Sequence, residues 1–401
     1  MRIVVLSPDI PFPANRGGRA DIWRRIQAMS SLGHEVMLVA SINSEHDFPS
    51  KEVHDVIASV VTTQFLYPIK RNFVLTVKRL LGSFWRPLHT ATRVPDTHTY
   101  NKMLESVRTF KPDALWLDGP WLGVLAERFS DAFKIPLLYR SHNVESIYMR
   151  GQACVAVRRR DRLALHLSCI GLRNFEQKIL QRATAVFDIS VDDLNFWKKK
   201  GMQHMHWLPP LPELAFRGKP ENTFPCDLVF VGNLATPNNV RGVEWLVNEV
   251  LPLIREQFPN ISCRIVGSNP TMFVRQILQK VSNVELCADV PDSTPYLFGA
   301  RVLVNPVMTG SGVQVKMLDM LMTDTSIVTT SQGTRGLPFS FKLLFRIADG
   351  TVAFAKAVCE ELHASSVSAA DRAEARETFS VAAVGHALEV GVPQWVRATG
   401  V

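Results

Sequence analysis

Short apolar runs of the strand type alternate with segments of helical periodicity along most of this 401-residue chain. Residues 3–6 form the first run, apolar side chains then recur at Ile22, Ile26 and Met29, and EVMLVAS follows Gly33 as the next run. Such spacing is typical of a helix, and a glycine is typical of a helix C-terminus. The alternation predicts βαβ units, and therefore parallel sheets covered by helices on both faces.

The alternation is interrupted once, by PPLPELAFRGKPENTFP at 209–225, which has five prolines and no periodicity. This composition is typical of a linker, and the chain is long enough for two hydrophobic cores. We predict an α/β protein with an N-terminal Rossmann-like domain over 1–210, a linker over 211–225, a second Rossmann-like domain over 226–375 and a C-terminal helix over 376–401.

Strand-like runs recur on both sides of this linker, at 113–119, 136–143, 184–190, 227–232, 262–267, 283–290, 301–307, 326–330 and 343–349. Ligands of doubly wound parallel sheets lie outside the carboxyl ends of the strands. We therefore expect the functional residues to follow these runs, with the ligand in a cleft between the two domains.

The composition, with 46% apolar and 20% charged residues, is that of a globular protein. The six cysteines show no CxxC or CxxH spacing, which indicates a reduced, zinc-free cytoplasmic protein without disulfides. The first apolar run is too short for a signal peptide. The sequence contains no run of about 18 apolar residues, so we expect no membrane-spanning helix. The net charge of +8 favours an anionic partner: nucleic acid, a phosphorylated substrate or the inner face of a membrane.

Residues 150–182 combine a basic cluster at Arg158–Arg160 with a stretch of apolar residues. A basic amphipathic segment can lie on an anionic membrane surface. The alternative is a long helix with one buried face. The nucleic-acid alternative is the weakest, because the basic residues are not interleaved with aromatic stacking residues.

Four motifs in order carry a resemblance to a known family: PFPANRGGRADIWRRIQAMSSLGHEVMLVA, YRSHNVES, FVGNLATPNNVRGVEWLVNEVLPLI and VNPVMTGSGVQVKMLDMLMTDTSIVTTSQGTRGL. The chain resembles the retaining GT-B glycosyltransferases of family four, the group-one sugar transferases of polysaccharide assembly. The resemblance spans nearly the whole chain. It implies two facing Rossmann-like domains, a C-terminal helix that returns to the first domain, and transfer of a sugar from a nucleoside-diphosphate sugar to a hydroxyl acceptor, lipid-linked or a growing glycan.

In the first domain, the resemblance implies that Gly17, Gly18 and Arg19 form a loop over the donor diphosphate, next to the acceptor. Glycines also suit a plain turn at this place. His142 follows the strand of YRSHN, where relatives place a histidine near the transferred sugar, although a lone histidine is more often structural. Glu145 suits either a helix cap or an acceptor ligand.

In the second domain, Gly232 ends a strand, and many relatives hold the diphosphate with an arginine and a lysine in the loop that follows. This chain has Asn233 and Asn239 near those positions, which leaves Arg241 and Lys316 as the cations available to the leaving group. Gly267 corresponds to a turn near the nucleotide base in relatives, and is otherwise a strand end.

GSGVQVKMLD, at 310–319, corresponds to the family's donor site. Asp319 aligns with a glutamate that binds the ribose hydroxyls, whereas Ser311 stands where many relatives place a second acid. The resemblance implies backbone N–H groups from Ser311, Gly312 and Val313 toward the diphosphate, with Lys316 on the next turn.

The sequence has no Asp-x-Asp at a strand end and no Walker or dinucleotide fingerprint, so we expect neither a metal nor a cofactor. We predict a cytoplasmic or membrane-peripheral retaining glycosyltransferase. The alternatives are a non-catalytic subunit that binds a sugar nucleotide, and an epimerase or phosphorylase of the same two-domain shape.

Overall fold

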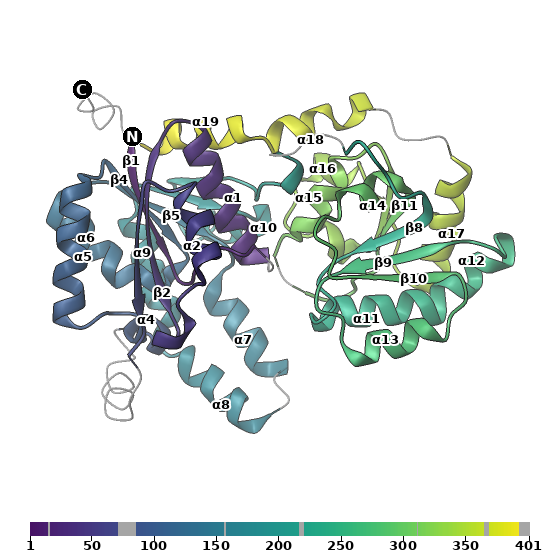
Figure 1. Cartoon of the computed structure of the whole chain (residues 1–401), viewed down its shortest axis with the longest axis horizontal. Helices are drawn as coiled ribbons and strands as arrows, with labels where there is room; N and C mark the ends of the chain where they lie inside the picture. Colours follow the sequence, from purple (N-terminus) through teal and green to yellow (C-terminus); the bar gives the residue numbers. More distant parts are fainter. Residues whose placement is uncertain are drawn as a thin grey trace. The chain divides into compact units, whose positions relative to one another are not determined.

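The computed structural model describes residues 1–14, 17–70, 86–155, 158–215, 220–310, 312–364 and 369–392. Internal contacts divide the chain into two units, Met1–Pro209 with the segment that begins at Val381, and Pro210–Ser380. Each unit has its own sheet and its own helices (Figure 1). None of the helices among the described residues is both long and apolar enough to cross a membrane.

The first unit contains a seven-stranded parallel sheet in the order β3-β2-β1-β4-β5-β6-β7. Its strands are β1 (Arg2–Ser7), β2 (Glu35–Ile42), β3 (Thr63–Pro68), β4 (Ala114–Asp118), β5 (Leu137–Ser141), β6 (Ala185–Asp188) and β7 (Met205–Trp207). The central strands are almost fully buried, as parallel strands covered on both faces are. The sequence patterns did not predict β3 or β7, because these edge strands are half-exposed and β7 has three residues.

Helices cover both faces of this sheet (Figure 1). They are α1 (Gly17–Ser31), α2 (Lys51–Ala58), α4 (Leu88–Thr92), α5 (Thr97–Phe110), α6 (Gly123–Phe133), α7 (Glu145–Val155), α8 (Arg159–Ser168), α9 (Leu172–Arg182), α10 (Val191–Lys198) and α19 (Val381–Gly391), with short 3-10 turns η1 (Glu45–Asp47) and η2 (Pro120–Leu122). The C-terminal helix α19 packs on this unit, since a Cβ on Gly391 would lie 2.5 Å from the ring of Phe187.

Residues 150–182 do not form the single long helix that the sequence suggested as one alternative. They are divided among α7, α8 and α9, and Gly171 precedes α9 with a φ of 70° that favours glycine. The buried apolar face belongs to α9, whereas Ser168 is the only fully buried residue of α8.

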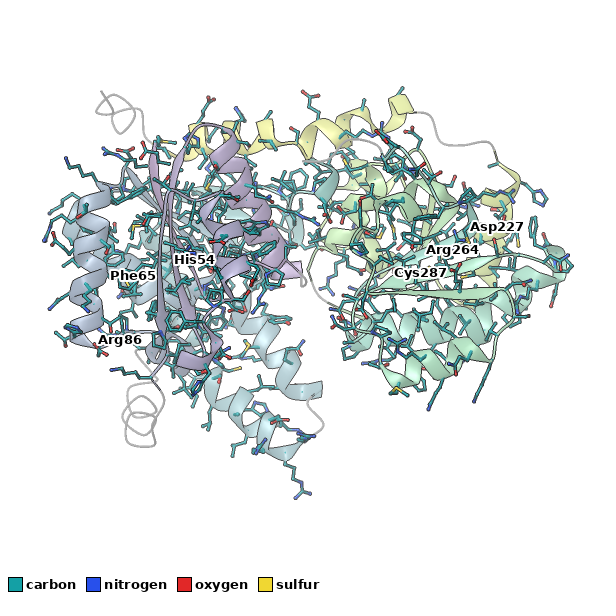
Figure 2. The ribbon with its side chains drawn as sticks, in the orientation of Figure 1. His54, Phe65, Arg86, Asp227, Arg264 and Cys287 are labelled. Atoms are coloured by element: carbon teal, nitrogen blue, oxygen red, sulfur yellow. The ribbon has the colours of Figure 1, made fainter. Side chains whose placement is uncertain are left out.

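The second unit contains a six-stranded parallel sheet in the order β10-β9-β8-β11-β12-β13. Its strands are β8 (Cys226–Val231), β9 (Cys263–Gly267), β10 (Val284–Ala288), β11 (Ala300–Asn305), β12 (Ser326–Thr329) and β13 (Arg346–Ile347). Figure 2 shows the side chains of both units, with Phe65 on β3, Arg264 on β9 and Cys287 on β10. The last strand is shorter than the run 343–349 that predicted it.

The helices of the second unit are α11 (Pro237–Trp245), α12 (Leu251–Gln257), α13 (Met272–Gln279), α14 (Thr294–Gly299), α15 (Val315–Leu321), α16 (Phe339–Lys342), α17 (Thr351–His363) and α18 (Ala373–Thr378), with 3-10 turns η3 (Glu213–Ala215), η5 (Ser331–Thr334) and η6 (Ala369–Arg372). A π-helical turn, η4 (Leu246–Val250), joins α11 to α12 just before Pro252. Because proline has no N–H group, one backbone hydrogen bond of a regular α-helix cannot form there, and a single π-helical turn accommodates the change.

Both sheets reverse their strand order at one point, between β1 and β4 in the first unit and between β8 and β11 in the second. Connections leave such a point in opposite directions, so the carboxyl ends of the two strands border an open crevice. The predicted fold class, two doubly wound parallel-sheet domains with a returning C-terminal helix, is confirmed.

Candidate functional site

The glycine pair of the first unit lies at the start of α1, beyond the carboxyl end of β1. A Cβ added to Gly17 or Gly18 would meet no atom of the chain within 4 Å, so packing does not require glycine at either position. Arg19 is paired with Asp9: its Nε donates to Asp9 Oδ2 over 3.0 Å, and its Nη2 donates to the same oxygen. These residues therefore gather at the switch point of the first sheet.

His142 follows β5 and lies between two carboxylates. Its Nε2 is 3.2 Å from Oδ1 of Asp118, the last residue of β4, and its Nδ1 is 3.5 Å from Oδ2 of Asp21 on α1. The side chains of Asp118 and Asp21 are 1% and 3% exposed, and that of His142 is 16% exposed. Burial lowers the pKa of His142, but the hydrogen bond to Asp118 and the charge of Asp21 outweigh it and raise this pKa above its ordinary value.

Asp21 also forms ion pairs with two buried arginines. The guanidinium of Arg140 donates to both Asp21 oxygens at 3.0–3.1 Å and also to the carbonyl oxygen of Leu208. Arg25, one helical turn beyond Asp21, lies 3.6 Å from its carboxylate and donates to Pro209 O over 2.7 Å. Burial raises the pKa of Asp21, but Arg140 and Arg25 outweigh it and leave this pKa below its ordinary value. Burial and the neighbouring Arg140 lower the pKa of Arg25 to about 9.

Three further acids are buried near the same edge of the sheet. Glu176 on α9 accepts hydrogen bonds from the backbone N–H groups of Glu145 over 2.7 Å and Ser146 over 3.2 Å, so Glu176 and not Glu145 caps α7. Burial raises the pKa of Glu145 to about 7, of Glu176 to about 8 and of Asp188 to about 7. Glu145 and Asp188 are therefore about half protonated near pH 7, and all three carboxyls are largely neutral near pH 6.

Lys316 is the central cation of the second unit's switch point. It lies in the first turn of α15, after β11, and its Nζ donates to Oδ1 of Asn239 over 2.9 Å. The ammonium also lies 4.3 Å from the ring centroid of Phe230 in β8. No anion of the described residues contacts it, and burial lowers its pKa to about 7.

The neighbouring loop packs tightly around Asn239. Asn239 Nδ2 donates to the carbonyl oxygen of Asn233 over 2.9 Å, and a Cβ on Gly232 would lie 2.9 Å from the same Nδ2. A Cβ on Gly267 would lie 1.8 Å from the carbonyl oxygen of Gly232. The ends of β8 and β9 therefore lie so close together that only glycine fits at 267. Packing alone explains this glycine, without any bound ligand.

The turn before α15 is held by amide side chains. Gln332 Nε2 donates to the carbonyl oxygen of Gly310 over 3.0 Å, and Asn305 Nδ2 donates to Oε1 of Gln314 over 3.1 Å. Gly312 has a φ of 72°, which favours glycine, and Val313 follows it in the same turn. Ser311 lies outside the described residues.

Asp319 lies one turn beyond Lys316 on α15, and its Oδ1 accepts a hydrogen bond from the backbone N–H of Glu213 over 2.6 Å. Arg241 is exposed on α11, two residues past Asn239. Since a helix turns by about 100° per residue, Arg241 points away from the side of α11 that carries Asn239. The structure thus brings Lys316, Asn239, Asn233 and Gly232 together, but not Arg241.

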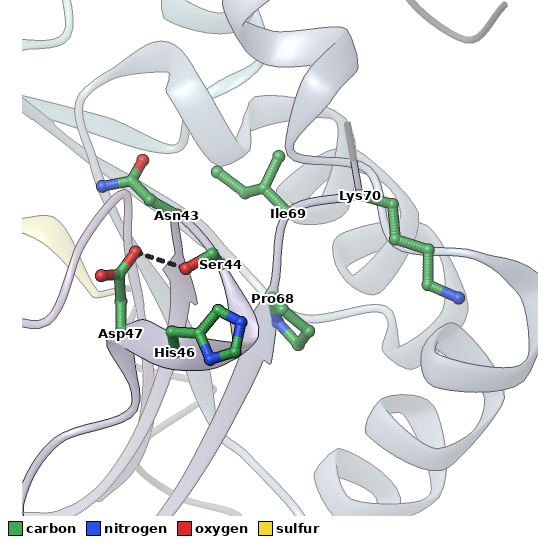
Figure 3. Close-up of a pocket in the computed structure, with 7 residues that line it drawn as sticks. All are labelled: Asn43, Ser44, His46, Asp47, Pro68, Ile69 and Lys70. Carbon is green, nitrogen blue, oxygen red and sulfur yellow. Dashed lines mark hydrogen bonds between the residues drawn. The ribbon is translucent and has the colours of Figure 1, made fainter. Parts of the chain in front are cut away.

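A hollow of about 520 Å³ lies at the ends of β2 and β3 in the first unit (Figure 3). It is lined by Asn43, Ser44, His46, Asp47, Pro68, Ile69 and Lys70. Because β3 and β2 lie to one side of the β1–β4 switch point, this hollow is separate from the His142 cluster. Among the residues whose positions the structure describes, no group of three or more His, Cys, Asp or Glu side chains is arranged to hold a metal ion.

The sequence patterns missed Asp21, Asp118 and Arg140. Asp118 had a usable signal, because it ends the run DALWLDG at the carboxyl edge of the sheet. Arg140 stands inside a strand and Asp21 inside a helix, and neither position by itself indicates a buried ion pair.

Residues 225–363 match the family model of group 1 glycosyl transferases. A curated relative, an uncharacterized 44.6 kDa protein in the cps region of Klebsiella pneumoniae, is 27% identical over 365 residues, 88% of this chain and 89% of the relative.

Solved structures share the fold over nearly the whole chain. Anabaena HepE, in a complex with UDP and glucose, is 10% identical, with a TM-score of 0.60 over 97% of this chain and 98% of HepE. Sucrose-phosphate synthase from Thermosynechococcus elongatus is 13% identical, with a TM-score of 0.58 over 99% of each chain. The resemblance to group-one sugar transferases that the sequence motifs predicted is confirmed by the family model over residues 225–363.

Proposed function

We propose that this chain, whose residues 225–363 form a group 1 glycosyl transferase domain, transfers a sugar from a nucleoside-diphosphate sugar to a hydroxyl acceptor with retention of anomeric configuration. The observation that carries the proposal is the Lys316 ammonium, which is partly buried at the β8–β11 switch point and contacts no anion among the described residues. A partly buried cation of this kind is poised for an anionic ligand, and a diphosphate would supply the missing charge.

Lys316 takes the place of the cationic clamps that Asn233 and Asn239 do not supply. In the proposed reaction, negative charge builds up on the departing diphosphate, and Lys316 stabilises that charge. Asn239 orients the ammonium through its Oδ1. Asp319 would bind the ribose hydroxyls with its carboxylate while it also holds the backbone of Glu213. Arg241 has no role in this geometry unless α11 or its side chain moves.

The acceptor is proposed to bind at the first unit, where Gly17, Gly18, Arg19, His142 and Glu145 lie at the carboxyl edge of the sheet. The open space around the two glycines suits close approach of a ligand to the backbone. Transfer is proposed to need no metal, with Lys316 as the group that offsets the diphosphate charge. Activity that persists in excess EDTA supports this part of the proposal, whereas loss of activity that Mg²⁺ restores overturns it.

Binding of nucleoside diphosphates tests the site directly. UDP, GDP and ADP are added separately, and the shift in melting temperature is recorded, because a ligand of the native state raises apparent stability. UDP is the first candidate, since HepE was solved with UDP and with UDP-glucose. One diphosphate should stabilise the parent protein and lose most of its effect on Lys316→Met, while Lys280→Met, an exposed lysine, should bind normally. Equal binding by all three proteins removes Lys316 from the site.

Turnover separates the enzymatic proposal from its alternatives. A phosphorylase needs free phosphate, an epimerase acts without an acceptor, and a binding subunit shows no turnover with any acceptor. Retention is read from the anomeric configuration of the product by NMR, and an inverted product would contradict the proposed mechanism. The relative in the cps region of Klebsiella pneumoniae favours acceptors from polysaccharide assembly, including lipid-linked glycans.

A peripheral membrane contact is the second part of the proposal. Arg158, Arg159, Arg160 and Arg162 are exposed around the start of α8, with Asp161 as the only acid among them, and Leu163 is 61% exposed. In Figure 1, α7 and α8 extend away from the sheet of the first unit. A basic surface with exposed apolar residues suits an anionic lipid bilayer.

Co-sedimentation with vesicles of phosphatidylglycerol and phosphatidylcholine tests this contact. Reversal of Arg158, Arg159 and Arg160 to glutamate should abolish sedimentation. Reversal of Lys51, Lys102 and Lys280, three exposed lysines elsewhere on the chain, makes the same change in net charge and should leave most binding intact. Equal losses in both triple variants would show that net charge, and not α8, governs the binding.

A further inference from the structure

Both ring nitrogens of His142 face carboxylate oxygens, at 3.2 Å from Asp118 and 3.5 Å from Asp21. A neutral imidazole has one N–H donor and one bare nitrogen, and a carboxylate only accepts hydrogen bonds. A bare ring nitrogen would therefore face a carboxylate oxygen with no proton between them. Only the imidazolium, with two N–H groups, satisfies both neighbours.

Asp118 depends on this imidazolium. Its side chain is 1% exposed, its Oδ1 faces His142, and its Oδ2 has no hydrogen-bond partner among the described residues. Asp21, in contrast, has the guanidiniums of Arg140 and Arg25 beside it. A buried carboxylate is costly without a counter-charge, and His142 is the cation hydrogen-bonded to Asp118, with Arg25 as a further positive charge that acts on it.

We infer that Asp118 and Asp21 are positioning residues that hold His142 as an imidazolium, with one N–H group hydrogen-bonded to Asp118 and the other facing Asp21. The inference rests on the proposed function only for its effect on turnover. It changes the role of His142: the ring has no free nitrogen to take a proton from the acceptor, so His142 acts through its positive charge and fixed orientation. Proton removal from the acceptor then falls to another group, and in the proposed reaction the leaving diphosphate can fill this role.

The charged and titratable groups around the ring agree with this assignment. Asp21 on α1 and Asp118 on β4 favour the protonated ring, whereas Arg140 on β5 opposes it. Glu145, in the first turn of α7, has a pKa raised to about 7 by burial and adds a negative charge above that pH. The sum keeps the pKa of His142 above its ordinary value despite burial.

Ring ¹⁵N NMR of the parent protein, labelled at histidine, tests the inference without any substrate. His142→Gln identifies the resonance by its disappearance. We expect both His142 nitrogens to be protonated at pH 7, with deprotonation above the pH at which exposed histidines titrate. One bare and one protonated nitrogen at pH 7 would overturn the inference, whether or not the protein transfers sugar.

Asp118→Asn keeps the shape of the side chain and removes its charge. We expect the proton affinity of His142 to fall at least tenfold, and kcat to fall more than tenfold with little change in the Kd for UDP, which binds the other unit. Asp188→Asn is the control, because Asp188 is a buried carboxyl at the end of β6, two strands from β4, and accepts a hydrogen bond from the Ser190 N–H over 3.0 Å. An unchanged His142 titration in Asp118→Asn also overturns the inference. If the parent protein does not bind UDP, that result would instead count against the proposed function.

Discussion

Binding of UDP should be coupled to protonation of Lys316. In the free protein, burial holds the pKa of Lys316 at about 7, so that near pH 8 only about one molecule in ten carries the ammonium. A bound diphosphate would place negative charge beside Nζ and raise this pKa toward the ordinary value. The folded, ligand-free protein must therefore take up a proton when the ligand binds above pH 7.

The expected magnitude follows from linkage. Affinity is fully expressed below the free pKa and weakens as the pH rises, by about tenfold per pH unit until the pKa of the complex is reached. Between about pH 7.5 and about pH 9 the dissociation constant should rise roughly 25-fold, or about 2 kcal/mol. The phosphates of UDP contribute little in this range, because their last pKa is near 6.

Isothermal titration calorimetry in buffers of different ionisation enthalpy measures both quantities. At about pH 8 the parent protein should take up about 0.9 proton per UDP. Lys316→Met should bind weakly with no proton uptake, and Lys280→Met should behave as the parent protein does. A UDP affinity that is independent of pH between about pH 7.5 and about pH 9, without proton uptake, would refute the reasoning.

Two further predictions concern stability, measured by urea unfolding. Gly267→Ala should lower the free energy of unfolding by about 3 kcal/mol, because its Cβ would lie 1.8 Å from a backbone carbonyl oxygen that cannot move aside as a side chain can. Gly151→Ala is the control: its Cβ meets no atom within 4 Å, and the substitution should cause no loss of stability. Glu145, Glu176 and Asp188 have pKa values raised to about 7, about 8 and about 7, so the stability that their protonated forms contribute is present at acid pH and lost as the pH rises. The urea midpoint of the first unit should therefore fall from about pH 5 to about pH 8, less steeply in Glu145→Gln, and a rise over this range would contradict the assignment.

The central strands and most of the helices of both units could be predicted from the sequence, because apolar spacing is a local signal that survives in the fold. The same signal failed at β3 and β7, where strands at a sheet edge are half-exposed and bury fewer apolar side chains. It also failed at 150–182, because one basic and apolar segment supplies both the buried face of α9 and the exposed surface of α8.

Positions at strand ends, such as His142, could be predicted as site candidates because parallel strands present their carboxyl ends together. The charge state of these residues could not be predicted from the sequence. Lys316 has a low pKa because Phe230 and Asn239, from other segments, enclose it, and His142 has a high pKa because Asp118 and Asp21 meet its two nitrogens.

The sequence by itself determined the two doubly wound domains, the break between them and the resemblance of residues 225–363 to group 1 glycosyl transferases. Only the tertiary structure decided which cation lies at the second unit's switch point, where Lys316 donates to Asn239 and Arg241 is exposed on α11. The physical reason is that secondary structure follows from the spacing of apolar side chains along the chain. Proton affinity depends instead on burial and on charges a few ångströms away, which folding brings from distant parts of the chain.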